Sequence, residues 1–450
     1  MRRLFGTDGI RGIANETLCC ETAMKIGRAM ASILASDEKR RLVILGMDTR
    51  ISSEMLANSI TAGLSSVGID SVNVGVIPTP AVAYLVTKYG ADAGIMISAS
   101  HNSYEYNGIK IFNSDGFKLP DELEERIESV VFEEPGNVIN ASSNRIGRMY
   151  SENSAVTDYT QHLLSAVDSD LTGLKIAVDC ANGASYATAK DLFRKLGAEC
   201  IMLSYSPNGT NINKKCGSTD MRLLREYVIR EKLDAGIAFD GDADRCLCID
   251  EKGETVDGDS IMASISLDMK KRGMLRKNTV VGTVMTNYGF EVFCNKNSIN
   301  FIPANVGDRY VLEEMVNGDY NFGGEQSGHI IFRDFATTGD GQLTAVKFLS
   351  MVKREGKKVS EITSVMKKYP QHMINLKVTQ ESKVAFFTDS EIKEIIAESK
   401  RKLRNRGRIL VRPSGTEELL RIMVEGEDDI QTVKAAKETA EKISEVLKKY

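Results

Sequence analysis

Short apolar runs alternate with amphipathic stretches along most of the chain. The apolar runs, such as those within 42–46, 175–179 and 279–283, are typical of buried β-strands. Between them lie stretches in which apolar residues recur at the three- and four-residue spacing of an α-helix, for example 57–67. Alternating strands and helices favour βαβ units and largely parallel sheets. The pattern therefore predicts an α/β fold.

One outline of apolar runs occurs three times. Each copy opens on one of the runs above and closes on a run that begins with aspartate. The closing runs begin at Asp92, Asp234 and Asp319. Six residues after these aspartates, polar loops begin at Ser98, Asp240 and Glu325. Ligands of open α/β sheets bind outside the carboxyl ends of the strands, so three similar units could direct these loops into one cleft.

The pattern changes near residue 370, where short strand-like runs mix with helical stretches at 390–405 and 430–448. This change predicts a smaller α+β domain after three similar domains with mixed or parallel βαβ-type sheets. The predicted domains are 1–150, 151–251, 252–368 and 369–450. Each domain then carries one of the loops discussed below.

The overall composition excludes several classes of protein. A nucleic-acid-binding domain would be strongly basic, whereas this chain of 450 residues has a net charge of −4. A membrane span needs about 18 consecutive apolar residues, and no such run occurs. The eight cysteines form no C-x-x-C pair, as expected for reduced thiols. We therefore expect a soluble cytoplasmic protein that binds neither nucleic acid nor membrane. A monomer or a homodimer is expected, and the composition does not decide between the two.

The loop after the run at 92–97 contains Ser100 followed by His101. A serine at the exposed end of a strand, beside a histidine, is a candidate nucleophile. Taken alone, the pair is more simply explained as a polar turn. No G-x-S-x-G elbow occurs, which argues against an α/β-hydrolase.

Three carboxylates occupy alternate positions after the run at 234–239, at Asp240, Asp242 and Asp244. Carboxylate oxygens are ligands for Mg²⁺ or Ca²⁺, and a bound cation would offset their mutual repulsion. An EF-hand is rejected because Arg245 occupies the position that requires glycine. An acidic surface turn remains the alternative, although apolar strands on both sides disfavour it.

Two later loops carry side chains suited to a phosphorylated sugar. The glycine-rich segment 323–329 offers the polar groups of Glu325 and Ser327, although a plain hairpin would have a similar composition. The second loop contains Arg412, with Arg421 downstream, and could form a phosphate cradle. Its alternative is an exposed basic turn. Near the start, Arg11 lies between glycines, either in a turn or as a charge directed into a cleft.

The five motifs, in this order, resemble the α-D-phosphohexomutase family over essentially the whole chain. The segments 6–12 and 324–329 and the loop around 412–417 are most similar to those of bacterial members that act on glucosamine phosphates. The resemblance implies a heart-shaped, four-domain protein with a central cleft. It would interconvert glucosamine 6-phosphate and glucosamine 1-phosphate through a phosphoserine and a 1,6-bisphosphate, feeding UDP-N-acetylglucosamine synthesis. Mg²⁺ would be the cofactor, with glucosamine or glucose 1,6-bisphosphate as activator.

The resemblance also implies a role for each polar residue of these motifs. The magnesium ligands would be Asp240, Asp242, Asp244 and an oxygen of phosphorylated Ser100. The sugar hydroxyls would be bound by Glu325 and Ser327. The phosphate that does not react would be bound by Arg412, Ser414, Gly415, Thr416 and Arg421. Groups near the transferred phosphoryl would be Lys110 and His101, with Arg11 and Arg245 as charge-stabilising partners and His329 as a further acid or base.

Two positions depart from the family's usual pattern. Ser103 and Glu418 each stand where the family usually has proline, which removes a rigidifying residue from two loops. We expect slower catalysis at most, because no proposed ligand or nucleophile is lost.

Three alternative functions stay open at this point. Mannose or glucose phosphates could replace glucosamine phosphates as the substrate. A Mg²⁺-dependent sugar-phosphate phosphohydrolase would share the acidic loop but would not need the clamp formed by Arg412 and Arg421. A catalytically silent sugar-phosphate-binding protein would tolerate loss of Ser100 or of the aspartates, and both are present.

Overall fold

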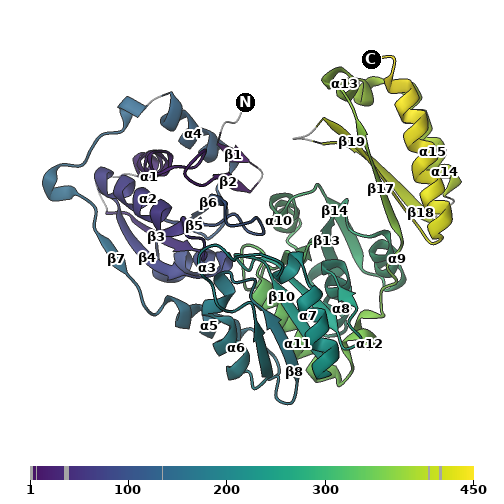
Figure 1. The fold of residues 1–450 in the computed structure, drawn as a ribbon, viewed down its shortest axis with the longest axis horizontal. Helices are drawn as coiled ribbons and strands as arrows, with labels where there is room; N and C mark the ends of the chain where they lie inside the picture. The colour runs from purple at the N-terminus through teal and green to yellow at the C-terminus, as the bar shows by residue number, and fades with distance from the viewer. Residues whose placement is uncertain (1–3, 7, 35–39, 134, 404–405, 415–417) are drawn as a thin grey trace. The chain divides into compact units, whose positions relative to one another are not determined.

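The computed structural model describes the chain except for residues 1–3, 7, 35–39, 134, 404–405 and 415–417 (Figure 1). The described residues form two compact units, which we treat separately. The first unit comprises 1–285 together with 300–364, and the second comprises 286–299 together with 365–450. Three of the four sheets belong to the first unit.

The first sheet has seven strands in the order β1-β2-β6-β5-β3-β4-β7. The strands are β1 (Phe5–Gly6), β2 (Gly9–Ile13), β3 (Leu42–Met47), β4 (Asp70–Val76), β5 (Ala93–Ile97), β6 (Tyr106–Asn113) and β7 (Met149–Ser151). The helices of this part are α1 (Cys20–Leu34), α2 (Ser53–Val67), α3 (Thr79–Tyr89), α4 (Asp121–Phe132) and α5 (Ala155–Ser165). Strands β3, β4, β5 and β7 pair in parallel, whereas β6, β2 and β1 add antiparallel strands beside β5.

Helices cover both faces of this sheet, which explains its continuous apolar strands. Val43 and Leu45 belong to a core that includes residues of α1 and α2. On the other face, a Cβ on Gly46 would lie 2.5 Å from the Val82 side chain of α3. The small residue therefore lets α3 pack closely against β3, and this packing sets the position of the amino-terminal end of α3.

The second and third sheets repeat a smaller version of this arrangement. Their strand orders are β12-β11-β10-β8-β9 and β14-β13-β15-β16. The second sheet contains β8 (Lys175–Asp179), β9 (Glu199–Leu203), β10 (Ala235–Phe239), β11 (Cys246–Asp250) and β12 (Thr255–Val256), with helices α6 (Ala189–Lys195) and α7 (Arg222–Glu231). The third contains β13 (Thr279–Thr283), β14 (Asn300–Ala304), β15 (Phe322–Gly324) and β16 (Ile330–Phe332), with helices α8 (Gly258–Lys271), α10 (Asp308–Asn317), α11 (Gly341–Glu355) and α12 (Val359–Thr363).

In each of these three sheets, a buried parallel strand is followed directly in the chain by a strand that pairs with it in the antiparallel direction. The pairs are β5 with β6, β10 with β11, and β15 with β16. The loops that join the strands of each pair are those beginning at Ser98, Asp240 and Glu325. The repeated outline found in the sequence therefore corresponds to a repeated structural unit.

The second unit has a three-stranded antiparallel sheet in the order β17-β19-β18. Its elements are α9 (Tyr288–Lys296), β17 (Gln371–Lys377), α13 (Gln380–Thr388), α14 (Ser390–Lys402), β18 (Gly407–Pro413), β19 (Leu419–Gly426) and α15 (Asp429–Leu447). Helix α15 packs on this sheet beside α14 (Figure 1). The α+β character expected of the carboxyl-terminal part is present.

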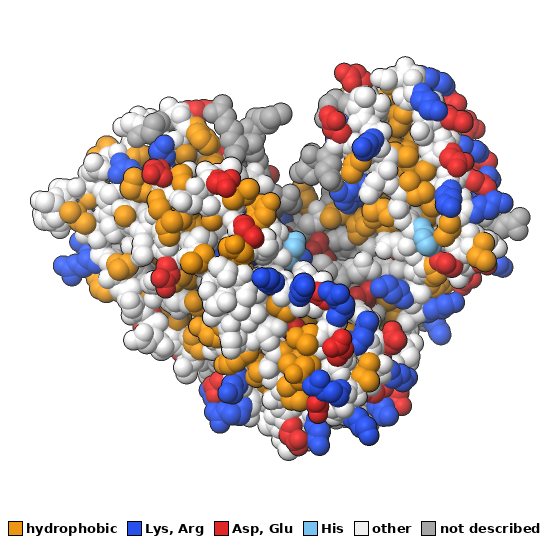
Figure 2. Space-filling view, in the orientation of Figure 1, with side chains coloured by type: hydrophobic (Ala, Val, Ile, Leu, Met, Phe, Trp, Pro, Cys, Tyr) orange, Lys and Arg blue, Asp and Glu red, His pale blue; other side chains and the backbone are white. Residues whose placement is uncertain are grey.

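Surface features agree with the balanced composition. On the face shown in Figure 2, basic and acidic side chains are interspersed. Among the helices that the structure describes, none is both long and apolar enough to cross a bilayer. The eight cysteines all lie in described segments and are free thiols.

Candidate active site

Two of the predicted loops meet at Ser100. This residue lies in the turn after β5, is fully buried, and donates a hydrogen bond from its hydroxyl to Asp240 Oδ2 at 2.6 Å. Asp240 begins the loop between β10 and β11, 140 residues later. The structure thus places the candidate nucleophile against the candidate metal loop.

The turn around Ser100 is fixed by groups that the sequence reasoning missed. Arg50, which is buried and forms an ion pair with Asp48, donates to the carbonyl oxygens of Ser100 at 3.0 Å and Asn102 at 2.6 Å. Asn213 donates to the same two carbonyls, at 2.9 Å each. These donors come from two sequence-distant segments, and no motif marks them.

His101 lies beside the nucleophile, with Nδ1 3.4 Å from the Ser100 hydroxyl. Burial, followed by the nearby charges of Arg245 and Arg11, lowers the pKa of His101 to about 4. The imidazole is therefore neutral near pH 7, with one ring nitrogen close to the Ser100 hydroxyl.

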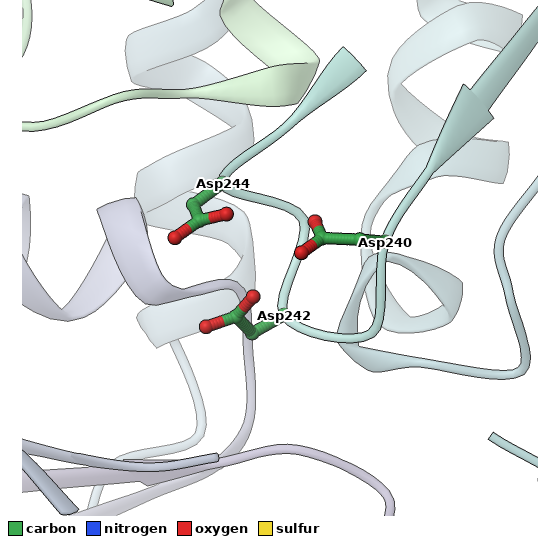
Figure 3. Close-up of side chains that lie close together, drawn as sticks. All are labelled: Asp240, Asp242 and Asp244. Carbon is green, nitrogen blue, oxygen red and sulfur yellow. The ribbon is translucent and has the colours of Figure 1, made fainter. Parts of the chain in front are cut away.

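The three aspartates of the metal loop point toward one another (Figure 3). They are buried, and one carboxylate oxygen from each lies within 4.8 Å of the others. Ala243, between two of them, has a left-handed φ of 57°, which turns the chain so that the side chains converge. Burial, together with the charges of Asp244 and Asp242, raises the pKa of Asp240 well above its usual value.

The donor set fits a divalent cation. Within the described residues, the buried oxygens Asp242 Oδ1 and Asp244 Oδ1 have no hydrogen-bond partner. A buried acceptor without a partner is costly, whereas Mg²⁺ binds such hard oxygen ligands. The residues present therefore fit magnesium.

Lys110 stands beside the same carboxylates. Its Nζ lies 3.0 Å from Asp242 Oδ2, 3.2 Å from Asp244 Oδ2 and 3.1 Å from Asp8 Oδ2. Burial opposes the charge of Lys110, but these three carboxylates outweigh it and raise the pKa well above its usual value. Lys110 is accordingly a fixed positive charge. Arg11 joins the cluster through Asp8 Oδ2, at 2.9 Å.

The third loop adjoins the metal loop through His329. Its Nδ1 lies 3.7 Å from Asp244 Oδ2, and its Nε2 accepts a hydrogen bond from the Gly339 N–H at 3.0 Å. Burial disfavours protonation of His329, yet Asp244 and Asp308 raise its pKa. Arg245, on the metal loop, lies 3.7 Å from Asp244.

Glu325 and Ser327 contact each other and the chain before α10. The Ser327 hydroxyl donates to Glu325 Oε2 at 3.3 Å, and the Gly307 N–H donates to Glu325 Oε1 at 3.2 Å. Both side chains are only partly buried. They therefore retain polar groups that a ligand could engage.

Sequence reasoning also missed a set of charges that links the first and third sheets. Lys118, which follows β6 and is partly buried, forms ion pairs with both Asp8 and Asp308. Asp8 lies inside the segment 6–12, which is one of the motifs that carry the family resemblance, so the sequence could have indicated it as a site residue. Lys118 and Asp308 lie in ordinary polar stretches, and no sequence motif indicates them.

The fourth loop belongs to the second unit. Arg412, near the end of β18, is directly opposite Arg421 of β19 in the sheet register. Burial, and then the charge of Arg421, lowers the pKa of Arg412. Two like charges opposed across a ladder are destabilising, and an anion would relieve this repulsion. Ser414 is buried next to them, whereas Gly415 and Thr416 lie outside the described residues.

The arrangement in the first unit suits phosphoryl transfer. Such reactions depend on positioning and on neutralising charge rather than on covalent chemistry by many groups. A hydroxyl nucleophile, a carboxylate cluster that fits Mg²⁺, and fixed cations such as Lys110 provide these functions in one place.

Comparison with known proteins agrees with this interpretation. Four segments match the family described as phosphoglucomutase/phosphomannomutase: alpha/beta/alpha domain I at 2–137, domain II at 157–253, domain III at 257–369, and the C-terminal domain at 373–442. A protein of Thermoanaerobacter sp. (strain X514) named phosphoglucosamine mutase is 52% identical over 447 residues, covering 99% of this chain and 100% of the relative. A protein of the same name from Clostridium novyi (strain NT) is 51% identical over 445 residues, covering 99% of each.

Solved structures show the same fold. A phosphoglucomutase/phosphomannomutase family protein from Burkholderia thailandensis has a TM-score of 0.84 at 20% identity, covering 99% of this chain and 97% of the other. The Aspergillus fumigatus N-acetylphosphoglucosamine mutase, solved with GlcNAc-6P and magnesium, has a TM-score of 0.64 at 16% identity, covering 94% and 99%. The resemblance and the α/β fold inferred from the sequence are confirmed. The chain belongs to the phosphoglucomutase/phosphomannomutase family.

Proposed function

We propose that this protein is an isomerase that interconverts glucosamine 6-phosphate and glucosamine 1-phosphate. The observation that carries the proposal is the 2.6 Å hydrogen bond from Ser100 to Asp240, inside a buried carboxylate cluster that fits Mg²⁺. The full-length relatives named phosphoglucosamine mutase support the choice of sugar. The product would feed UDP-N-acetylglucosamine synthesis.

We assign one role to each loop. Ser100 would carry the phosphoryl group, and Asp240, Asp242 and Asp244, with an oxygen of that group, would hold Mg²⁺. When bound, the metal neutralises charge on the transferring phosphoryl oxygens. The sugar is held by Glu325 and Ser327. The distal phosphate is held by Arg412, Ser414, Gly415, Thr416 and Arg421. The four domains that carry these loops are 1–150, 151–251, 252–368 and 369–450.

The bond from phosphorus to Ser100 Oγ breaks while a bond forms to the 1- or 6-oxygen of the phosphosugar, and that hydroxyl loses its proton. His101 is placed to take this proton and pass it to the freed Ser100 Oγ, because it is neutral and adjacent to Ser100. The resulting 1,6-bisphosphate then returns its other phosphoryl group to Ser100.

The surrounding cations would stabilise the transferring charge. Lys110, Arg11 and Arg245 are held near the metal loop by ion pairs, so little reorganisation is needed when negative charge develops. His329, whose Nε2 accepts from Gly339, holds Asp244 and is a further acid or base candidate.

We further propose the setting in which the enzyme works. Glucosamine or glucose 1,6-bisphosphate would restore phosphoserine that has lost its phosphoryl group, and so act as an activator. The protein would act in the cytoplasm on this small phosphosugar, as a monomer or homodimer, without nucleic acid or membrane.

The test is a substrate panel. The protein is incubated with Mg²⁺, a trace of glucose 1,6-bisphosphate, and the 6-phosphates of glucosamine, mannose or glucose. We expect glucosamine 1-phosphate to form fastest, and Ser100→Ala to be at least about 1,000-fold slower. Faster conversion of the mannose or glucose compound would reassign the substrate, and release of inorganic phosphate alone would indicate a phosphohydrolase.

Intact-mass spectrometry checks the nucleophile separately. After bisphosphate treatment, the wild-type protein should gain about 80 Da, the mass of one phosphoryl group, and Ser100→Ala should not. An equal gain in both proteins would place the phosphoryl group on another residue.

A further inference from the structure

Thr79 contacts the metal loop from another part of the chain. It is the first residue of α3 and is fully buried. Its hydroxyl donates to Asp242 Oδ2 at 2.6 Å, and its backbone N–H donates to the Asp242 carbonyl at 2.9 Å. The amino end of a helix has free N–H groups and a positive dipole, both of which favour a carboxylate partner.

The two oxygens of Asp242 differ in their surroundings. Oδ2 accepts from Thr79 and, at 3.0 Å, from Lys110. Oδ1 is buried and has no hydrogen-bond partner among the described residues. The donors thus occupy one oxygen and leave the other for a cation. Asp244 is divided in a similar way, since Lys110 donates to its Oδ2, whereas its Oδ1 has no hydrogen-bond partner among the described residues and lies 3.7 Å from Arg245 Nε.

We propose that Thr79 is a positioning residue that selects which oxygen of Asp242 binds the metal. The inference rests on the proposed magnesium site. A carboxylate can exchange its two oxygens by rotation about the Cβ–Cγ bond. Thr79 opposes this rotation because its backbone is anchored in α3 and its β-branched side chain has few rotamers. Lys110 donates to the same oxygen, but its ammonium is shared with Asp8 and Asp244 and therefore fixes Asp242 less specifically.

The main chain of the metal loop has separate support. The Gly341 N–H, at the start of α11, donates to the Ala243 carbonyl at 3.0 Å. The hydrogen bond from the Thr79 N–H to the Asp242 carbonyl is also kept when only the Thr79 side chain is substituted. Removing the Thr79 hydroxyl should therefore change the orientation of one carboxylate and leave the loop backbone in place. A positioning role can thus be separated from a role in folding.

The position of Thr79 also links two functions. Helix α3 packs on the sheet whose strand β5 leads to Ser100, whereas Asp242 lies in the loop between β10 and β11 of the second sheet. The first sheet and its helix α3 therefore both position the nucleophile and orient a metal ligand. Any shift between the two sheets would disturb both together.

The experiment compares four variants of the full-length protein with the wild type. Thr79→Val removes the hydroxyl but keeps the shape, and Thr79→Ala is a second form of the same deletion. Thr79→Ser restores the hydroxyl. Thr87→Val is the matched control, because Thr87 lies in the same helix, is exposed, and its hydroxyl donates to the Tyr84 carbonyl rather than to the metal loop.

Mn²⁺ binding, followed by electron paramagnetic resonance, is the readout that does not depend on activity. We expect Thr79→Val and Thr79→Ala to bind Mn²⁺ about 10-fold more weakly, the range seen when a partner of a metal ligand is lost. Thr79→Ser and Thr87→Val should stay within about twofold of wild type. In the mutase assay, kcat should fall while KM for the sugar phosphate changes little.

Several results would overturn the inference. These are wild-type Mn²⁺ affinity in both hydroxyl-deleted variants, a failure of Thr79→Ser to restore affinity, or an equal loss in Thr87→Val. A wild-type protein that binds no divalent cation would also overturn it. A protein that binds Mn²⁺ in the expected order but converts none of the sugars would leave this inference standing and refute the proposed activity instead.

Discussion

Ser100 has an unusual backbone conformation. Its φ of 51° lies in the left-handed region, which costs an L-residue about 1 kcal/mol. The turn persists because Arg50 and Asn213 each bridge the Ser100 and Asn102 carbonyls. Strained residues of this kind gather at functional sites, where the surrounding structure holds them in place.

Arg50 should therefore be needed for activity as an arginine. We expect Arg50→Lys to lower kcat about 10- to 100-fold, because a single ammonium cannot reproduce a planar fork that reaches two carbonyls and Asp48. The unfolding free energy should fall by about 1–3 kcal/mol. Steady-state kinetics and thermal unfolding measure the two effects.

Arg41→Lys is the matched control, since Arg41 precedes β3 and forms a partly exposed ion pair with Asp92 at 2.6 Å. That variant should keep nearly normal activity. Unchanged kcat in Arg50→Lys would show that the turn does not need its guanidinium.

At the scale of single residues, the sequence indicates which side chains carry the chemistry but not which residues hold them in position. Ser100 and Asp240 could be predicted because each follows an apolar strand. Arg50 and Thr79 could not, because their partners lie 50 and 163 residues away and neither belongs to a recognisable motif. Their roles depend on packing between segments that only the folded chain brings together.

At the scale of elements, the three hairpin-like pairs determine where the chemistry lies. Each reverses the chain at the carboxyl end of a buried strand, and residues of two of the resulting loops, Ser100 and Asp240, are in contact. The repeat of elements was predictable from apolar runs. The antiparallel direction of β6, β11 and β16 was not, because an apolar run does not state which neighbour it pairs with.

The first two loops approach each other so closely that only glycine fits at position 241. A Cβ there would lie 2.4 Å from the Ser100 carbonyl oxygen and 2.8 Å from Asn213 Nδ2. We expect Gly241→Ala to push the Ser100 turn away from the metal loop and to lower kcat about 100-fold, the effect of a displacement of roughly 1 Å. Phosphorylation of Ser100, followed by intact mass, should slow in parallel.

Gly136→Ala is the control for this substitution, since a Cβ at that position meets nothing within 4 Å. It should leave the rate unchanged. A Gly241→Ala variant with wild-type rates of turnover and phosphorylation would mean that the two loops can separate without loss.

At the scale of the whole molecule, compact units do not follow the order of the sequence. Residues 286–299 belong to the second unit, although they lie within the segment 257–369 that matches the third family domain. Buried Glu425 of β19 explains the association. It pairs with Arg408 at 2.6 Å and accepts from Asn287 at 3.1 Å. A domain boundary placed at a single point in the sequence cannot describe a unit that is built from two separate segments.

Within the first unit, helix α5 ties distant segments together. His162 stacks on Tyr84 of α3, with ring centroids 4.1 Å apart. Tyr159 donates to Asp340 Oδ2 at 2.8 Å, and Asp340 also caps α11 by accepting from the Leu343 N–H at 2.9 Å. Asp340 is thus a buried carboxylate at a junction of segments 181 residues apart.

This carboxylate should make the stability of the fold depend on pH. Burial raises the pKa of Asp340 from 3.8 to about 6, although the Leu343 and Tyr159 hydrogen bonds oppose the rise. Between pH 4 and pH 6 the folded protein therefore binds more protons at this group than the unfolded chain does. The stabilisation by proton binding is complete below pH 4 and is lost as the pH rises through 6. This rise in the pKa of Asp340 corresponds to a contribution of about 3 kcal/mol to the free energy of unfolding.

Asp340→Asn should remove this contribution, because the amide does not titrate and asparagine still caps a helix. Urea unfolding, followed by circular dichroism at pH 4.5 and pH 7, gives the unfolding free energy of both proteins. From the lower to the higher pH, the wild type should lose about 2–3 kcal/mol relative to the variant. Tyr159→Phe, which keeps the carboxyl and removes a donor to its charged form, should lose at least as much as the wild type. If all three proteins changed in parallel between the two pH values, the pH dependence would have to come from groups other than Asp340.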